Sequence, residues 1–205
     1  MTAQVHDVVL LGGAEHALTG IAGSGLFAVA EHGIHPGMLG TGCWRGHYCV
    51  YAVRDGRLVL AELRLGHGAT LHGTPLAGDE PLLGGTVVAV EPASASWLHE
   101  AFALYDLAWP VAFTGTLLAA RDLVSSGPHM GYWPAWHYGT VVELVVERGA
   151  VTATRDRSAE MAETRRAIEA GERAHPDGER GSPGWVERTF GLGYDRSAPP
   201  RPPTP

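Results

Sequence analysis

Cysteine, arginine and histidine occur at alternate positions in the segment Cys43-Trp44-Arg45-Gly46-His47. A cationic neighbour lowers the pKa of a thiol, and the resulting thiolate is a nucleophile once a base lies within reach. This spacing predicts a catalytic site with Cys43 as nucleophile, Arg45 as anion clamp and His47 as acid–base group. We favour the alternative, in which Cys43 and Trp44 belong to a core and Arg45 lies along a sheet edge, because nothing in the sequence places a base beside the thiol.

Residues 129–138 combine two histidines with four aromatic side chains, just before a predicted strand. The four aromatic residues are Tyr132, Trp133, Trp136 and Tyr138. Aromatic walls with a few polar groups suit a ligand pocket or the centre of a partner-binding surface. In a pocket, His137 is a second acid–base candidate. The same composition suits a loop that closes one end of a core, and the sequence leaves these two interpretations open.

Two pairs of histidines have short spacings that are compatible with metal binding. They are His32 with His35, and His67 with His72. A zinc site needs several converging ligands, whereas neither pair has an obvious third partner and no HExxH pattern occurs. We therefore predict no metal and no cofactor, and we interpret these histidines as solvated loop residues.

Composition excludes several classes of protein. The chain contains no lysine, and all fifteen of its basic residues are arginine. Schiff-base enzymes, P-loop proteins and standard protein kinases are excluded, because each needs a lysine. A net charge of −7 and scattered arginines argue against a nucleic-acid partner. The abundance of alanine and glycine is typical of a high-GC genome such as that of an actinobacterium.

The expected setting is the cytoplasm. Residues 1–7 lack the basic region that opens a signal peptide, and the longest apolar run, 107–120, is interrupted by Pro110 and too short to span a bilayer. We therefore predict no membrane partner. Cys43 and Cys49 are too few for a disulfide scaffold and are expected to be reduced.

These candidate residues must be positioned by the secondary structure, and the clearest element is a β-hairpin in residues 43–63. His47–Arg54 is rich in residues that favour strands, and Asp55-Gly56 favours a type I′ turn. In the second strand, Leu58, Leu60 and Glu62 are expected on one face, opposite Val59, Ala61 and Leu63. Both faces carry apolar residues, so both are expected to be partly covered.

The remaining elements follow from periodicity and turn residues. We predict strands at Val8–Leu11, Thr86–Val90 and Val111–Ala120, and a hairpin of His137–Val146 and Ala150–Thr154 around Arg148-Gly149. We predict helices at Ser94–Ala108 and Arg157–Arg173. Loops are predicted over 14–42, around the apolar patch Leu26–Ala30, and over 66–85. Met161 and Ile168 give that last helix only a thin apolar stripe, so loose packing is expected.

Strands outnumber helices, which predicts a mainly β (α+β) fold. We expect a curved antiparallel sheet or open barrel with one or two flanking helices. The predicted organisation is a β-rich domain over 1–155, a polar helix over 156–174 and a disordered, proline-rich tail over 175–205. Strand order and oligomeric state are not predicted.

Three segments together resemble a group of small uncharacterised bacterial proteins with a CWRGY-like motif. They are Cys43-Trp44-Arg45-Gly46 running into the hairpin, Phe113-Thr114-Gly115, and HMGYWPAWHYG at 129–139. The resemblance covers about a third of the chain. It implies a β-rich fold and no particular activity. His47 stands where that group has an aromatic residue, which bears on the register of the first strand.

The leading functional hypothesis is a cytoplasmic binding or accessory module. Its aromatic loop and the Trp44-Arg45 corner would recognise a protein partner or a small ligand, and immunity or self-protection is one role that suits such a module. On this hypothesis, alanine at both Trp133 and Trp136 abolishes binding and leaves the fold intact. The alternative is a small-molecule enzyme with a His/Arg/Cys pocket in a barrel mouth. A third hypothesis is self-association through sheet edges.

Overall fold

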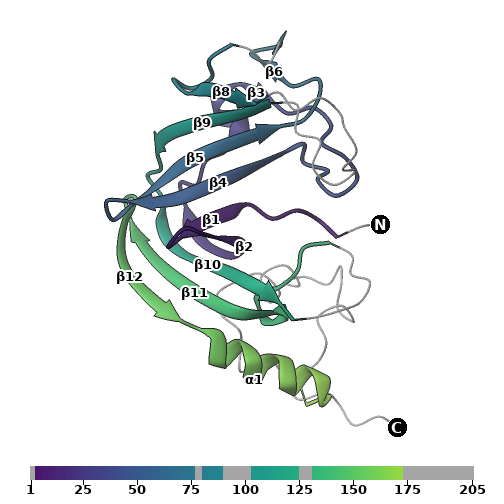
Figure 1. The fold of residues 1–205 in the computed structure, drawn as a ribbon, viewed down its shortest axis with the longest axis vertical. Coiled ribbons are helices and arrows are strands. Elements are labelled where there is room, and N and C mark those ends of the chain that lie inside the picture. Colours follow the sequence, from purple (N-terminus) through teal and green to yellow (C-terminus); the bar gives the residue numbers. More distant parts are fainter. Residues whose placement is uncertain (1–2, 77–79, 90–102, 125–130, 173–205) are drawn as a thin grey trace.

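Nine strands form one mixed sheet that curls into a nearly closed ring (Figure 1). The computed structural model describes residues 3–76, 80–89, 103–124 and 131–172. The strands of the large sheet, in spatial order, are β12 (Ala150–Asp156), β11 (Tyr138–Glu147), β10 (Thr114–Leu123), β2 (Ala14–Ser24), β1 (Val8–Leu11), β4 (His47–Arg54), β5 (Arg57–Leu65), β9 (Ala103–Pro110) and β8 (Thr86–Ala89). The predicted mainly β class is confirmed, with one departure, because β1 pairs with β4 in parallel.

The smaller elements are a three-stranded sheet, two 3-10 turns and one α-helix. They are β3 (Ile34–His35), β6 (Thr70–Leu71), β7 (Thr74–Pro75), η1 (Val29–His32), η2 (Ala135–His137) and α1 (Ser158–Glu169). In Figure 1 the helix lies at the lower end of the molecule, directly after β12. No helix in the described ranges is long and apolar enough to cross a membrane.

Both predicted hairpins are present, and their tips meet. Asp55 and Gly56 have φ values of 49° and 71°, while Arg148 and Gly149 have 44° and 80°. These left-handed conformations are those that a two-residue type I′ turn requires. The two tips join through hydrogen bonds from the Leu58 N–H to the Gly149 carbonyl (2.7 Å) and from the Val151 N–H to the Gly56 carbonyl (2.8 Å). This contact closes the ring at the end drawn on the left of Figure 1.

A bulge in β5 changes which side chains share a face. Tyr51 pairs with Leu60 and Val50 pairs with Glu62, so Ala61 is the extra residue. An extra residue shifts the alternation by one. Leu58 and Leu60 therefore share the interior with Leu63 rather than with Glu62. The expected alternation holds up to Leu60 and is wrong beyond it.

Strand β2 overturns the prediction that residues 14–42 are loops. Its glycines obscure the strand pattern, yet Gly23 lies directly opposite Gly115 of β10. Both have φ near +145°, a region that only glycine adopts readily. A Cβ on Gly115 would also collide with the Ala22 carbonyl oxygen. The glycines therefore permit a close approach of two backbones that strand-forming residues would prevent.

Alanine at Gly115 is expected to lower the free energy of unfolding by about 2 kcal/mol, because it combines backbone strain with a backbone clash. Gly12→Ala is the matched control. Gly12 also has a positive φ, but its Cβ would meet no neighbour. Urea denaturation of both variants measures the difference. Equal losses would show that neither the φ of Gly115 nor its approach to β2 costs more than the ordinary left-handed conformation of Gly12.

Two other predicted elements are corrected. Residues 103–108 were expected to end a helix but belong to β9, where Ala103, Tyr105 and Leu107 alternate into the core. The rest of that predicted helix, 94–102, lies outside the described residues. The strand predicted at Val111–Ala120 begins and ends later, at Thr114–Leu123. The strand predicted at Thr86–Val90 is present as β8, whose last described residue is Ala89.

The helix predicted at Arg157–Arg173 is shorter and better packed than expected. α1 buries Met161 completely against the outer face of β10 and β11. Arg165, which interrupts the apolar stripe, donates from Nη1 to the carbonyls of Trp136 (2.6 Å) and Tyr138 (3.3 Å). Those bonds satisfy backbone groups at η2, so the arginine fastens the helix instead of loosening it. The predicted tail at 175–205 lies outside the described residues.

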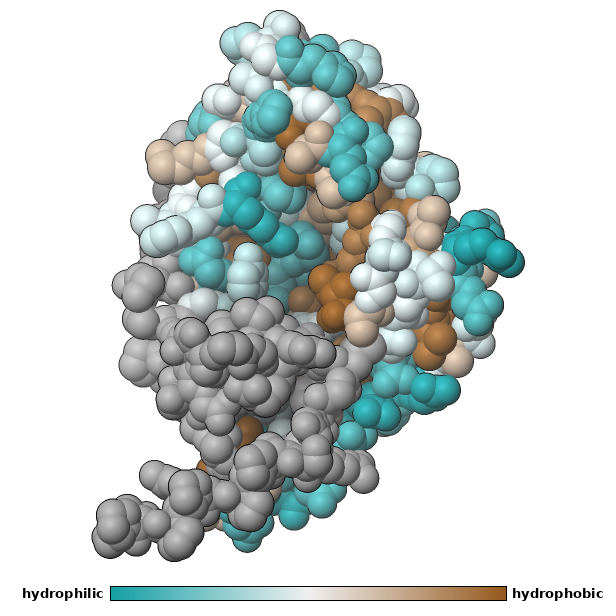
Figure 2. All heavy atoms as spheres, turned by 180° about the vertical axis from the view of Figure 1, so that it is seen from behind, coloured by the Kyte–Doolittle hydropathy of each residue, from teal (hydrophilic) through white to brown (hydrophobic). Residues whose placement is uncertain are grey.

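Three apolar clusters hold the fold together. The largest fills the ring with inward-facing side chains from seven of the nine strands, including Tyr51 and Tyr105, and with Phe113 from the connection between β9 and β10. The second lies between α1 and the sheet, and the third contains Cys43 and covers the outer face of β1 and β4. On the face opposite to Figure 1, apolar surface is interrupted by hydrophilic residues (Figure 2). The exposed large apolar residues of the described ranges are Ile21, Met38, Trp44, Val88, Leu123 and Val124.

Candidate functional site

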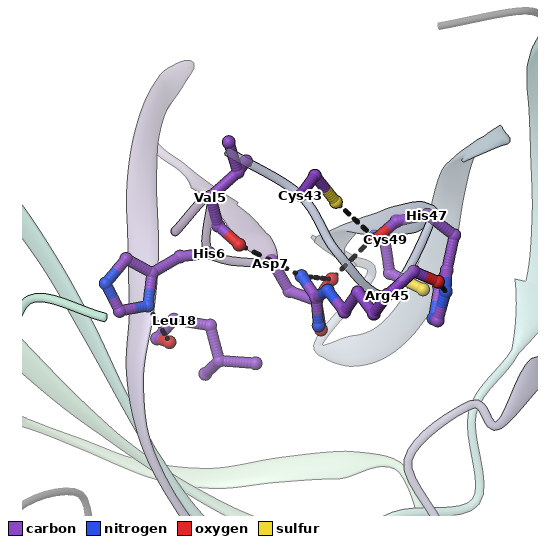
Figure 3. Close-up of polar contacts among 8 residues, drawn as sticks. All are labelled: Val5, His6, Asp7, Leu18, Cys43, Arg45, His47 and Cys49. Carbon is purple, nitrogen blue, oxygen red and sulfur yellow. Dashed lines mark hydrogen bonds and ion pairs between the residues drawn. The ribbon is translucent and has the colours of Figure 1, made fainter. Parts of the chain in front are cut away.

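Arg45 forms a two-pronged ion pair with Asp7, and this pair organises the region around the Cys43–His47 segment (Figure 3). Nη2 lies 2.8 Å from Oδ1 and Nη1 lies 3.1 Å from Oδ2. Asp7 Oδ1 also accepts the backbone N–H of Cys49 at 2.7 Å. Asp7 immediately precedes β1, so its side chain continues the pairing of β1 with β4 by one position. The pair therefore joins a loop to two strands.

The arginine has further partners on both sides. Nη2 reaches the Val5 carbonyl at 3.3 Å, and the guanidinium lies over the Tyr132 ring, 5.9 Å from its centre. Burial acts against the charge of Arg45, but the charge and hydrogen bonds of Asp7, together with Tyr132 and Cys43, outweigh it, so the pKa is raised above its usual value. Arg45 is therefore a fixed cation already paired with a carboxylate. The anion-clamp role would require a ligand to compete with Asp7.

Cys43 is a buried thiol without the features of a nucleophile. Its Sγ donates to the His47 carbonyl at 3.2 Å. Burial raises the pKa of the thiol, and the opposing effect of Arg45 is smaller. The thiolate is thus disfavoured at neutral pH. Cys43 and Cys49 are both free, as predicted.

His47 is also engaged by the backbone. Its Nδ1 lies 3.0 Å from the Arg45 carbonyl, which only accepts hydrogen bonds, so Nδ1 carries a proton. Burial lowers the pKa of the ring, so the imidazole stays neutral at neutral pH. Cys43, Arg45 and His47, the three predicted catalytic residues of this segment, therefore lie close together. Each of them already bonds to another group of the protein.

His6 is a central residue that the sequence analysis missed. Nδ1 lies 3.0 Å from the Leu18 carbonyl, while Nε2 lies 3.1 Å from the backbone nitrogen of Trp133. The ring also packs against Tyr132, with 5.1 Å between ring centres. Burial lowers the pKa of His6 from 6.5 to about 4. His6 therefore joins the N-terminal segment, β2 and the predicted aromatic loop.

Trp44 is the exception to burial in this region. Its side chain is 72% exposed. Its backbone N–H donates to Gln4 Oε1 at 3.2 Å, and Gln4 Nε2 donates to the Thr41 carbonyl at 3.1 Å. The Gln4 backbone N–H in turn donates to the Gly131 carbonyl. The prediction that Trp44 belongs to a core therefore does not match its position, whereas Cys43 is buried as that interpretation requires.

The four predicted aromatic residues do not form one exposed cluster. Trp136 is only 3% exposed, and it packs with Tyr138 in the apolar cluster beneath α1. Burial raises the pKa of Tyr138 to about 12. Tyr132 and Trp133 are partly buried beside His6. Two of the four residues expected to form a recognition surface, Trp136 and Tyr138, therefore belong to the core. They lie where the chain passes from η2 into β11, and α1 covers them.

The predicted acid–base residue His137 lies in a different environment from His47. Its ring contacts Trp133 edge-on, with 4.8 Å between centres, and is tilted against Trp136 at 6.0 Å. These contacts place it at the edge of the cluster beneath α1, whereas His47 contacts the Arg45 backbone.

The histidine pairs are separated by their surroundings. His32 stacks on Phe27 and meets Trp109 edge-on. Its partner in the sequence, His35, is exposed, as are both His67 and His72. Within the described ranges, no three histidine, cysteine or carboxylate side chains converge as a metal site would need.

Comparison with known proteins gives no relative. No family model, curated protein or solved structure matches this chain. The candidate site is therefore defined by the residues around Arg45 and Trp44. We call this region the corner, and define it as residues 4–7, 43–47 and 131–133.

Proposed function

We propose that this protein is a binding module that recognises a protein partner through Trp44. The observation that carries the proposal is the 72% exposure of the Trp44 side chain. The groups on either side of Trp44 in its loop are held in place by hydrogen bonds. Tryptophan is the residue type most enriched among interface hot spots. A ring that projects into solvent suits insertion into a pocket of a partner, rather than enclosure of a small ligand.

The loop that carries Trp44 is pre-organised. The Cys43 N–H donates to the Gly40 carbonyl at 3.2 Å and the Gly46 N–H donates to the Cys43 carbonyl at 3.1 Å. Gln4 accepts the Trp44 N–H on one side, and Asp7 holds Arg45 on the other. A loop that is already ordered loses little conformational entropy on binding. These contacts therefore support a recognition role for an exposed ring that contributes little to the fold.

A second exposed apolar side chain lies on the same connection between β3 and β4. Met38, on the same loop, is 76% exposed. Methionine adapts its shape to a partner more readily than branched residues do.

The contrast with Cys43 and His47 supports binding over catalysis, because both of those groups are neutral, partly or fully buried, and bonded to backbone carbonyls.

Alanine at Trp44 is expected to weaken partner binding at least tenfold without unfolding the protein, because it removes an exposed anchor. The tagged protein is used to capture partners from a lysate of the source organism, and the affinity of any captured protein is then measured with the purified pair. Val88→Ala on β8 is the matched control, since Val88 is 59% exposed and distant in the sequence. A Trp44→Ala variant that captures the same partner with unchanged affinity would overturn the proposal.

A further inference from the structure

The two ring nitrogens of His6 have opposite hydrogen-bonding roles. The Leu18 carbonyl only accepts, so Nδ1 must donate to it, and the Trp133 N–H only donates, so Nε2 must accept from it. The neutral ring with its proton on Nδ1 satisfies both contacts. A protonated ring has N–H groups at both positions and must break the contact with Trp133.

Among the described residues, the charged and titratable groups that face His6 are Arg45, Asp7 and Tyr132. Arg45 acts to lower the pKa of His6, and Asp7 acts to raise it. Because Arg45 and Asp7 form an ion pair, both charges lie near the ring and their effects oppose each other. Burial is the largest influence and brings the pKa to about 4. The closed ring is therefore neutral through the physiological range and gains a proton only near pH 4.

The segment that His6 holds is connected to Trp44. Gly131 pairs with Ala3, and its carbonyl accepts the Gln4 N–H at 2.8 Å. The side chain of Gln4 accepts the Trp44 N–H. A displacement of residues 131–133 therefore removes a support of the residue that fixes the Trp44 backbone.

We propose that His6 is a proton-controlled latch, which in its neutral form fastens Trp133 to the N-terminal segment and on protonation releases it. The release of Trp133 stands on the His6 contacts alone. The further consequence, that the latch regulates binding at Trp44, rests on the proposed function.

Amide hydrogen exchange at Trp133 tests the latch directly. Its protection factor, which is corrected for the intrinsic effect of pH, is expected to fall at least tenfold between pH 6.5 and 3.5. The loss should begin below pH 6.5, the ordinary pKa of a histidine, and be complete near pH 4, the pKa of His6 in the closed form. Leu118 in the core of β10 is the reference amide and should keep its protection. Unchanged protection at Trp133, or parallel loss at Trp133 and Leu118, would overturn the latch.

Two substitutions separate the two contacts. Glutamine at His6 has the reach to accept the Trp133 N–H and does not titrate, so His6→Gln should keep Trp133 protected at both pH values. Asparagine keeps only a donor near Leu18, so His6→Asn should show weak protection at both. A His6→Gln variant with the pH response of the natural protein would assign that response to another group.

The regulation of binding by His6 and the binding through Trp44 are tested by different outcomes. A partner captured through Trp44 should bind His6→Gln normally and His6→Asn at least fivefold more weakly. Equal binding to both variants overturns the regulation and leaves the latch. Unchanged capture by Trp44→Ala overturns the proposed function, while the exchange at Trp133 still decides the latch.

Discussion

Alanine in place of Asp7 is expected to lower the free energy of unfolding by about 3 kcal/mol, in the range found when one partner of a buried ion pair is removed. The guanidinium of Arg45 would remain largely desolvated without its carboxylate. The backbone N–H of Cys49 would lose its acceptor at the same time, and an unsatisfied buried donor alone costs about 1–3 kcal/mol. The 29% exposure of the Arg45 side chain limits the loss, because water can reach part of it.

Urea denaturation at pH 7 measures the effect. Glu160→Ala is the control, because Glu160 pairs with Arg157 within a helix turn and such a pair contributes only about 0.5 kcal/mol. Asp7→Asn separates the two contributions, since asparagine keeps an acceptor for Cys49 but not the charge. A double variant of Asp7 and Arg45 should lose less than the sum of the single losses. A loss of unfolding free energy below 1 kcal/mol for Asp7→Ala would show that water takes the place of the Asp7 carboxylate beside Arg45.

Alanine in place of Trp136 is expected to lower the free energy of unfolding by about 4 kcal/mol, because it empties a large volume beneath α1. The ring packs with Met161 and Tyr138 in a cluster that joins the helix to the sheet. This result would correct the sequence-based hypothesis that alanine at Trp133 and Trp136 leaves the fold intact. The loss of binding in such a double variant would reflect unfolding.

Trp44 and Trp133 provide the same substitution in two other environments. Trp44→Ala should cost less than about 0.5 kcal/mol, as surface changes do, and Trp133→Ala should fall between the two. Circular dichroism during urea denaturation measures all three. Equal losses at Trp136 and Trp44 would contradict the burial that separates them.

The parts of the fold predicted from sequence are those with local signals. Asp55-Gly56 and Arg148-Gly149 are recognisable because a type I′ turn needs particular residue types, and the flanking strands alternate. β2 has no such signal, since its glycines serve a close approach to a strand far along the chain. In β9, short windows match both a helical and a strand spacing, and the pairing with β5 and β8 selects the strand.

The candidate site divides in the same way. Cys43, Arg45 and His47 lie together because they are close in the sequence. Asp7 is 38 positions from Arg45 and His6 is 127 positions from Trp133, so no local pattern joins them. The one available signal is a charged residue directly before an apolar strand, which is common in proteins and does not name a partner.

The close pairing of β2 with β10 has a consequence for synthesis of the chain. Thr19 bonds to Leu118 across 99 positions. At a translation rate of roughly 5–20 residues per second, the interval between the two strands is about 5–20 s. During that time β2 has left the ribosome without the neighbour on one of its edges, and an unpaired edge is a site of aggregation. Glycine weakens an isolated strand, so the glycines that let β2 and β10 meet are also expected to lower the tendency of β2 to pair with other chains during that interval.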